Sequence, residues 1–380
     1  VDNPPRAPAA IIMPTFKTLG LSDPLISALA LQAITSPTEI QSQAFPLLSQ
    51  RKDAWLSAPT GSGKTLAYLL PLVARIDASG TDLQVAILSP TQELAVQIHE
   101  CIRLLQAERV PAVRSQMLIG NASAQRQKEK LKKKPHIVVG TCGRMLELGK
   151  QRKLKLHLCN SVVIDEADNL LAEDSIEDIE AFLKMTPRDR QLIFTSATDK
   201  GHSFQMAQSI GQDVQWLEAK RNSAASTIQH QFAEARYHNK AKVLFQILEL
   251  QQPERAIVFV HRNESAEELA DELERRQVPL QVLHGTLSKF ERKYAIEQFR
   301  SGSVPLLIAS DVAARGLDIK GVSHIINIDL PSSTDDYLHR AGRTGRMGAS
   351  GIAISIVTEE EMTLIRRYER DLDIAIQPLN

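Results

Sequence analysis

Short apolar runs rich in β-branched residues alternate along the chain with stretches in which apolar residues recur at helical spacing. The runs lie at residues 54–57, 85–89, 117–120, 137–140, 162–165 and 192–196 in the first half, and at 256–260, 281–284, 306–310, 324–329 and 352–357 in the second. Between the runs, Leu94, Ile98 and Ile102 follow a helical period. Strands that alternate with helices are typical of parallel sheets with crossover connections, so the pattern predicts an α/β fold.

This alternation is interrupted between Trp216 and Ile228 by a polar stretch rich in small residues. A chain of 380 residues is also longer than one hydrophobic core usually organises. We therefore expect two tandem parallel-sheet domains, at residues 1–218 and 228–380, joined by a short linker at 219–227.

Composition narrows the class of protein. Hydrophobic residues make up 43% and charged residues 24%, and the 45 basic residues cancel the 45 acidic ones. Because the net charge is zero, any polyanion that binds must be held by local patches of positive charge. Three distant cysteines exclude a disulfide framework. There is no apolar run of about 18 residues and no signal-peptide pattern. These features predict a soluble cytoplasmic protein, with an organelle or the nucleus left open.

Residues 58–65 read Ala-Pro-Thr-Gly-Ser-Gly-Lys-Thr, between a predicted strand and a predicted helix. In a P-loop the backbone N–H groups hold the phosphates of a nucleotide, and here they would come from Thr60, Gly61, Ser62 and Gly63. Lys64 would reach the β- and γ-phosphates of ATP, and the Thr65 hydroxyl would bind Mg²⁺. Ala58 replaces the first glycine of the general pattern, and the alternative is a chance Gly-Ser-rich turn.

Asp165, Glu166 and Asp168 follow directly after the apolar run at 162–164, at the end of a predicted strand. Ligands of doubly wound sheets bind at the carboxyl ends of the strands, so this cluster and the P-loop should converge. Asp165 would hold Mg²⁺ through water, and Glu166 would orient or deprotonate the attacking water. The alternative is a solvated helix start.

Residues 339–346 read His-Arg-Ala-Gly-Arg-Thr-Gly-Arg. The three arginines are either a solvated basic loop or arginine fingers that stabilise the transferring phosphoryl group when the domains close. No second P-loop pattern follows in the predicted second domain, which favours the fingers.

Together these motifs resemble, in order and spacing, the DEAD-box ATP-dependent RNA helicases of superfamily 2. The resemblance runs from about Phe16 to about Leu379 and implies two RecA-like domains that hydrolyse ATP and remodel RNA. It implies that Gln41 reads the adenine edge while Phe16 stacks on the ring. It also implies that Ser196 and Thr198 couple hydrolysis to domain closure, that Gly316 lies near the γ-phosphate and that Asp318 contacts the ribose. Arg343 and Arg346 would be the arginine fingers. His339 would link this motif to the motifs at 165–168 and 196–198.

The RNA-facing motifs depart from the family pattern at several positions. Gln92 stands where arginine is usual, and Asn121, Cys142 and Lys289 replace glycine, proline and glutamine. The residues expected to contact the RNA backbone are Thr91, Gln92, Gly120, Thr141, Arg144, Arg292 and Ser310. Only 17 of 380 residues are aromatic, 10 Phe, 5 Tyr and 2 Trp, so recognition of base sequence by stacking is not expected.

We therefore expect a monomeric ATP-dependent RNA helicase or RNA–protein remodeller with no membrane contact, whose substrate is chosen by flanking segments or protein partners. One alternative is a nucleotide-gated RNA clamp with weak or no unwinding, and another is a DNA-directed helicase of the same superfamily. The basic runs at 128–134 and 150–155 are either solvated faces or sites of non-specific RNA attraction.

Overall fold

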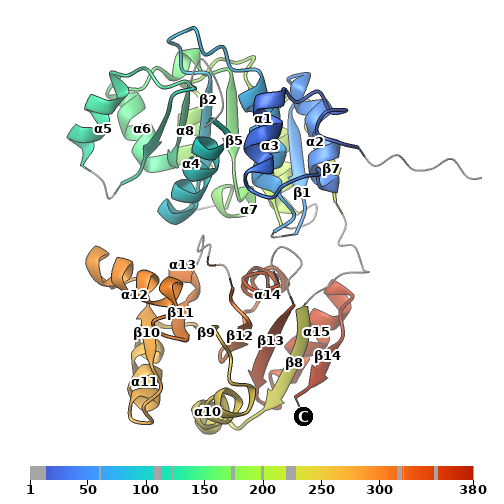
Figure 1. Ribbon diagram of the computed structural model, residues 1–380, viewed down its shortest axis with the longest axis vertical. Helices are drawn as coiled ribbons and strands as arrows, with labels where there is room; N and C mark the ends of the chain where they lie inside the picture. The colour runs from blue at the N-terminus through green and yellow to red at the C-terminus, as the bar shows by residue number, and fades with distance from the viewer. Residues whose placement is uncertain are drawn as a thin grey trace, which may run out of the picture.

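The structure is a computed structural model that describes residues 14–59, 61–106, 113–120, 123–172, 176–197, 201–219, 228–314, 319, 321–345 and 350–379. Its strands form two seven-stranded sheets, and each sheet is flanked by helices (Figure 1). We call the part built on the first sheet domain 1 and the part built on the second sheet domain 2. None of the helices described combines the length and apolarity needed to cross a membrane.

The first sheet has the strand order β3-β4-β2-β5-β6-β1-β7. Its strands are β1 (Ala54–Ser57), β2 (Val85–Ser89), β3 (Ser115–Leu118), β4 (Ile137–Thr141), β5 (Ser161–Ile164), β6 (Gln191–Ser196) and β7 (Gln215–Glu218). The helices of domain 1 are α1 (Asp23–Ala30), α2 (Glu39–Ser49), α3 (Lys64–Ala74), α4 (Gln92–Gln106), α5 (Ala124–Leu131), α6 (Cys142–Lys150), α7 (Ala167–Leu170), α8 (Ile176–Leu183) and α9 (His202–Ile210).

The second sheet repeats this plan with the order β10-β11-β9-β12-β13-β8-β14. Its strands are β8 (Ile228–Glu234), β9 (Ala256–Val260), β10 (Leu280–Leu283), β11 (Leu306–Ser310), β12 (His324–Asn327), β13 (Gly351–Val357) and β14 (Ile376–Pro378). The helices of domain 2 are α10 (Lys240–Gln251), α11 (Asn263–Glu274), α12 (Lys289–Ser301), α13 (Asp311–Ala314), α14 (Thr334–Ala341) and α15 (Met362–Leu372).

Both sheets are parallel in every strand pairing of the described residues. Helices cover both faces, which explains why central strands are apolar throughout. On β1, Leu56 packs into the apolar cluster on one face of the sheet, while Trp55 packs into the cluster on the other. The predicted α/β class and the tandem arrangement of two parallel sheets are confirmed.

All eleven predicted strands exist, with ends shifted by up to two residues, but β7, β8 and β14 were missed. β7 is the last strand at one edge of the first sheet, and β8 and β14 are the last two strands at one edge of the second, where strands need not be apolar. The sequence of β8 includes Gln229, His230 and Gln231, and it therefore lacks an apolar run.

The carboxyl ends of the strands in domain 1 face domain 2. Figure 1 shows the end of the first sheet that carries α7 turned toward α13 and α14. Because β1, β6 and β5 are neighbours in the sheet, the segments that follow them meet at this edge. The limits at 218 and 228 remain our proposal for the linker, since residues 220–227 lie outside the described part.

Candidate active site

The P-loop connects the end of β1 to the start of α3. Gly61 and Gly63 have φ of +82° and +89°, a left-handed conformation that favours glycine. A Cβ at Gly63 would also collide with the Gln41 amide. The loop thus presents its backbone at the N-terminus of an eleven-residue helix, which is a favourable site for phosphate. Gly61, Ser62, Gly63, Lys64 and Thr65 are described, whereas Thr60 lies outside the described residues.

Gln41 is bound to the P-loop in this structure. Its Nε2 donates to the carbonyl of Gly63 at 3.1 Å, and its Oε1 accepts from the backbone N–H of Thr38 at 3.0 Å, which caps α2. The side chain is 3% exposed. Phe16 is likewise buried, in the apolar cluster that contains Phe45. The contacts of Gln41 and Phe16 with adenine therefore stay predictions, and Gln41 has a role in positioning the P-loop that the sequence did not reveal.

Lys64 folds back onto its own loop. Its ammonium donates to the carbonyl of Ala58 and, at 3.2 Å, to that of Pro59. Burial lowers the pKa of Lys64, while the negative charges of Asp165, Asp168 and Glu166 act in the opposite direction. The ammonium and the acidic cluster therefore share one site, as the order of the motifs predicts.

Asp165 is held by two hydroxyl groups. Thr195 Oγ1 donates to Asp165 Oδ1 and accepts from the backbone N–H of Glu166 at 3.1 Å, and the Tyr68 hydroxyl donates to Asp165 Oδ2 at 3.2 Å. Burial raises the pKa of Asp165, and the Thr195 bond and the Lys64 charge oppose that shift. Sequence reasoning missed Tyr68 and Thr195. The signals available were a hydroxyl one helical turn beyond Lys64 and a polar residue within a buried strand.

Glu166 has a strained backbone, with φ of +50° and ψ of +56°. Its Oε2 accepts from Asn169 Nδ2 at 3.3 Å. Burial, followed by repulsion from Asp165, raises the pKa of Glu166 to about 7, and the positive charge of Arg343 counteracts this. A carboxyl with such a pKa can accept a proton near neutral pH.

Thr65 and Asp165 lie on either side of the Tyr68 hydroxyl, which is hydrogen-bonded to both side chains. Such oxygen ligands suit Mg²⁺, which binds through one or two carboxylates together with phosphates and water. No cluster of three or more His, Cys, Asp or Glu in metal-binding geometry occurs among the described residues. The residues present therefore fit the expected ion.

Ser196 links the acidic cluster to the P-loop. Its side chain is hydrogen-bonded to Asp168, and its carbonyl accepts from the backbone N–H of Ala58 at 3.2 Å. Thr198, the other residue expected in this motif, lies outside the described residues, as do Gly316, Asp318 and Arg346.

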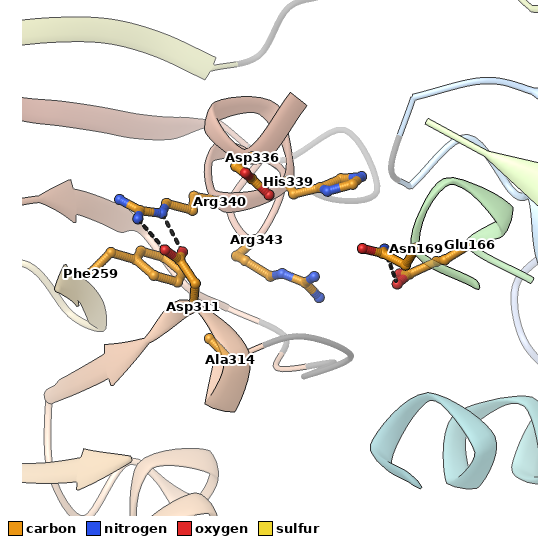
Figure 2. A pocket seen from close by; sticks show the side chains of 9 residues that line it. All are labelled: Glu166, Asn169, Phe259, Asp311, Ala314, Asp336, His339, Arg340 and Arg343. Atoms are coloured by element: carbon orange, nitrogen blue, oxygen red, sulfur yellow. Dashed lines mark hydrogen bonds and ion pairs between the residues drawn. The ribbon is translucent and has the colours of Figure 1, made fainter. Parts of the chain in front are cut away.

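Domain 2 closes the site from the opposite side. In Figure 2, Arg343 and His339 point across the pocket toward Glu166 and Asn169. The pocket is lined by Glu166 and Asn169 of domain 1 and by Phe259, Asp311, Ala314, Asp336, His339, Arg340 and Arg343 of domain 2. Two segments that are far apart in the chain therefore line one pocket, and the roles expected of Glu166, His339 and Arg343 stay predictions.

Arg340 is a structural arginine. It is 2% exposed, and it binds Asp311 through two hydrogen bonds of 2.6 and 2.5 Å and Asn327 Oδ1 through one of 3.0 Å. These bonds fix α14 against the ends of β11 and β12. Arg343, one of the two arginines expected as fingers, lines the pocket, while Arg346 lies outside the described residues.

The residues of domain 1 that are expected to contact RNA gather at the carboxyl ends of β2, β3 and β4, which are adjacent strands. They are Thr91, Gln92, Gly120, Thr141 and Arg144. Arg144 donates to the Gly120 carbonyl at 2.8 Å and pairs with Glu147 at 2.9 Å. Its contact with an RNA phosphate stays a prediction.

In domain 2, Ser310 ends β11 beside a hollow lined by His261, Arg262, Asn263, Glu264 and Gly285. Its hydroxyl oxygen is buried without a hydrogen-bond partner in the described part of the chain. A buried polar atom of this kind is available to a ligand.

Arg292, which is expected to contact an RNA phosphate, is bonded to other protein groups in this structure. Its guanidinium pairs with Glu93 of domain 1 at 2.9 Å and donates to the Ala313 carbonyl at 2.8 Å. A phosphate contact by Arg292 stays a prediction that requires these bonds to be shared or broken.

Comparison with known proteins identifies the two halves. The sequence profile described as DEAD/DEAH box helicase matches residues 38–206, and that described as Helicase conserved C-terminal domain matches residues 239–348. The chain is 37% identical over 94% of its length to the DEAD-box ATP-dependent RNA helicase CshA of Geobacillus kaustophilus, covering 76% of that protein. It is also 37% identical to CshC of Bacillus cereus, over 89% of this chain and 86% of that one.

Solved structures agree with this chain in fold and differ from one another in how closely the whole chain superposes. The chain is similar to S. cerevisiae Dbp5 bound to RNA and ADP BeF3, with a TM-score of 0.88, 28% identity and coverage of 96% and 95% of the two chains. For a Dbp5 variant bound to Nup159, Gle1, IP6 and ADP, the TM-score is 0.68 at 27% identity, with 95% of each chain covered. Because the fold is the same, the difference indicates that the arrangement of the two domains here is closer to that in the RNA-bound Dbp5 structure than to that in the ADP-bound complex. By its sequence and its fold, this chain belongs to the family of DEAD-box ATP-dependent RNA helicases.

Proposed function

We propose that the chain couples RNA-stimulated ATP hydrolysis to local separation of RNA strands, and that hydrolysis takes place only when the two domains close. The observation that carries this proposal is that Glu166 of domain 1 and Arg343 of domain 2 face the same pocket. Neither domain contributes both the base and the finger.

The roles of the residues follow from their contacts. The P-loop N–H groups and Lys64 bind the triphosphate, Glu166 accepts a proton from the attacking water, and Arg343 stabilises charge on the transferring phosphoryl group. Thr65 and Asp165 would hold Mg²⁺, which supplies charge neutralisation between the phosphates when bound. Arg346, Gly316 and Asp318 complete the site in this proposal.

RNA would be held by its backbone at the ends of β2, β3 and β4 of domain 1 and at Ser310 of domain 2. Closure brings these two surfaces together, so ATP and RNA should each raise the affinity for the other. Dbp5, which has the same fold, is bound to RNA and to a nucleotide analogue in the structure with the higher TM-score.

The three cysteines are free thiols. Burial raises the pKa of Cys101, Cys142 and Cys159 to about 12, so these thiols are poorly reactive. We propose a cytoplasmic monomer whose RNA substrate is selected by flanking segments or protein partners.

The test is release of phosphate with and without RNA, with a DNA strand of the same sequence as competitor. RNA should stimulate the rate in the intact protein, and Arg343→Ala should lower the maximal rate by about 10³-fold or more. Arg370→Ala is the matched control, since Arg370 is 75% exposed on α15. Stimulation by DNA alone would overturn the choice of substrate. RNA binding without hydrolysis would instead indicate the nucleotide-gated clamp.

A further inference from the structure

Two segments of domain 1 concentrate positive charge in a chain that is neutral as a whole. Residues 126–134 and 150–155 contribute the ten basic side chains Arg126, Lys128, Lys130, Lys132, Lys133, Lys134, Lys150, Arg152, Lys153 and Lys155, which we call the basic rim. The two segments contain one acidic residue, Glu129. The rest of the chain therefore carries the compensating acidic excess, and the rim is locally positive.

The two segments reach the same edge of the sheet. The first leads from α5 to the amino end of β4, and the second follows α6, which packs against β4. Since α6 starts directly after β4 and packs against it, the end of α6 at Lys150 lies toward the amino end of that strand, which the first segment precedes. Leu131 and Leu154, one from each segment, both pack on the apolar cluster on one face of the sheet. Figure 1 shows α5 and α6 on the same side of domain 1.

Within the part of the chain that the structure describes, the charges of the rim are not balanced by ion pairs. Nine of the ten side chains are exposed, and Lys128 is half-buried. Elsewhere on the surface, lysines pair with acids one turn away, as Lys184 does with Glu180 and Lys293 with Glu297. None of the ten rim side chains forms such an ion pair with a residue that the structure describes. Like charges at this spacing repel, and a bound polyanion would relieve that repulsion.

We propose that the basic rim is a second RNA-binding surface. It holds the phosphate backbone of an RNA segment that flanks the segment bound at the carboxyl ends of β2, β3 and β4, a site that we call the cleft. The rim binds this RNA without nucleotide. The inference rests on the proposed RNA-dependent function. Lysines and arginines without aromatic neighbours suit phosphate contacts that release counterions and read no sequence. The large apolar side chains that are exposed in the described chain all lie outside the rim, which argues against a protein interface or insertion into a membrane.

The rim and the cleft lie at opposite ends of β4. The strand has five residues, so four steps of about 3.3 Å separate its two ends by ~13 Å. A short RNA that fills the cleft cannot occupy both, whereas a longer RNA can. The rim should therefore affect only long RNAs.

The experiment compares two triple variants of the full chain with the same change in charge. In the rim variant, Lys132, Lys133 and Lys134 are replaced by Gln, and in the control variant Lys184, Lys242 and Lys293 are replaced by Gln. RNAs of about 6 and about 30 nucleotides are titrated by fluorescence anisotropy at three salt concentrations, without nucleotide. RNA-stimulated phosphate release is measured in parallel.

The rim variant should bind the long RNA about tenfold more weakly at low salt, and its salt slope should fall by about 2, which is three contacts at ~0.7 each. Its maximal ATPase rate with the short RNA should equal that of the wild type. Equal binding of long RNA by the rim and control variants would overturn the proposal and would leave an acidic protein as the candidate partner. Equal losses with short and long RNA would also overturn it. Absence of RNA stimulation in the wild type would refute the proposed function instead, so the two failures are distinguishable.

Discussion

Arg292 on α12 and Glu93 on α4 form an ion pair that joins the two domains, with 2.9 Å between Nε and Oε1. The side chains are 22% and 29% exposed, so the pair is partly shielded from solvent. Arg292 also donates to the Ala313 carbonyl. Ala313 lies in α13, the helix that follows directly after β11, the strand that ends at Ser310. The segments of domain 1 and domain 2 that are expected to contact RNA are therefore bonded to each other in the closed arrangement.

This pair should contribute to the coupling between ATP and RNA. Glu93→Gln removes the charge and keeps the shape, which should weaken closure by about 0.5–1 kcal/mol after allowance for solvent screening. The ratio of RNA affinities with and without a non-hydrolysable ATP analogue should fall two- to fivefold, as ~1.4 kcal/mol corresponds to tenfold.

The matched control is Glu100→Gln on the same helix, because the pair of Glu100 with Arg103 lies within α4. An unchanged ratio in the Glu93 variant would show that the ion pair does not contribute to coupling.

The pKa of Glu166 predicts a pH dependence of hydrolysis. Burial raises this pKa to about 7, and a general base acts only when deprotonated. As the pH falls through 7, kcat/KM for ATP should decline, approaching a tenfold loss per pH unit at lower pH. The profile of kcat/KM is the relevant measurement because it reports the free enzyme. Glu166→Gln should retain ATP binding, lose most of the rate and show no inflection near pH 7. A wild-type profile that is flat from pH 5.5 to 8 would remove Glu166 from its assigned role.

Lys64→Ala should abolish tight ATP binding. The ammonium is the cation nearest the expected β- and γ-phosphates, and the backbone N–H groups alone cannot offset the triphosphate charge. Affinity, measured by calorimetry, should fall by about 100-fold or more, which is ~2.7 kcal/mol.

The melting temperature provides the control for this variant. A ligand that binds only the folded state raises it, so ATP should shift the melting temperature of the wild type and not that of Lys64→Ala. If Lys64→Ala remains folded without nucleotide and still binds ATP as tightly as the wild type, Lys64 does not bind the phosphates as assigned.

The sequence predicted the central strands and the main site because both depend on local patterns. The apolar run at β1 followed by a glycine-rich loop specifies a strand, a turn and a helix start, and Asp165 follows a buried strand in the same way. The bonds from Tyr68 and Thr195 to Asp165 could not be predicted, since they depend on the lateral position of β6 and α3. The pair between Glu93 and Arg292 spans 199 residues and exists only when the domains close.

Gln92 provides the test of whether a departure from the family pattern weakens the RNA grip. It is the first residue of α4, and its amide lies near Gly120, since a Cβ added at that glycine would be 3.9 Å from Gln92 Nε2. Arg144 donates to the carbonyl of the same glycine. The position thus belongs to the cluster at the ends of β2, β3 and β4.

Gln92→Arg should therefore add about one phosphate contact. The salt dependence of single-strand binding should steepen by a slope of ~0.7, and the gain in affinity should be largest at low salt. The new arginine should not disturb Glu93, because neighbouring residues of a helix do not face each other. Titration of a short RNA at three salt concentrations, with the nucleotide analogue present, separates the two slopes. Gln92→Lys is the matched comparison, with the same charge but a single-point contact in place of a bidentate one. Parallel slopes for wild type and both variants would mean that position 92 does not meet phosphate, and that its amide serves only to pack against the Gly120 turn.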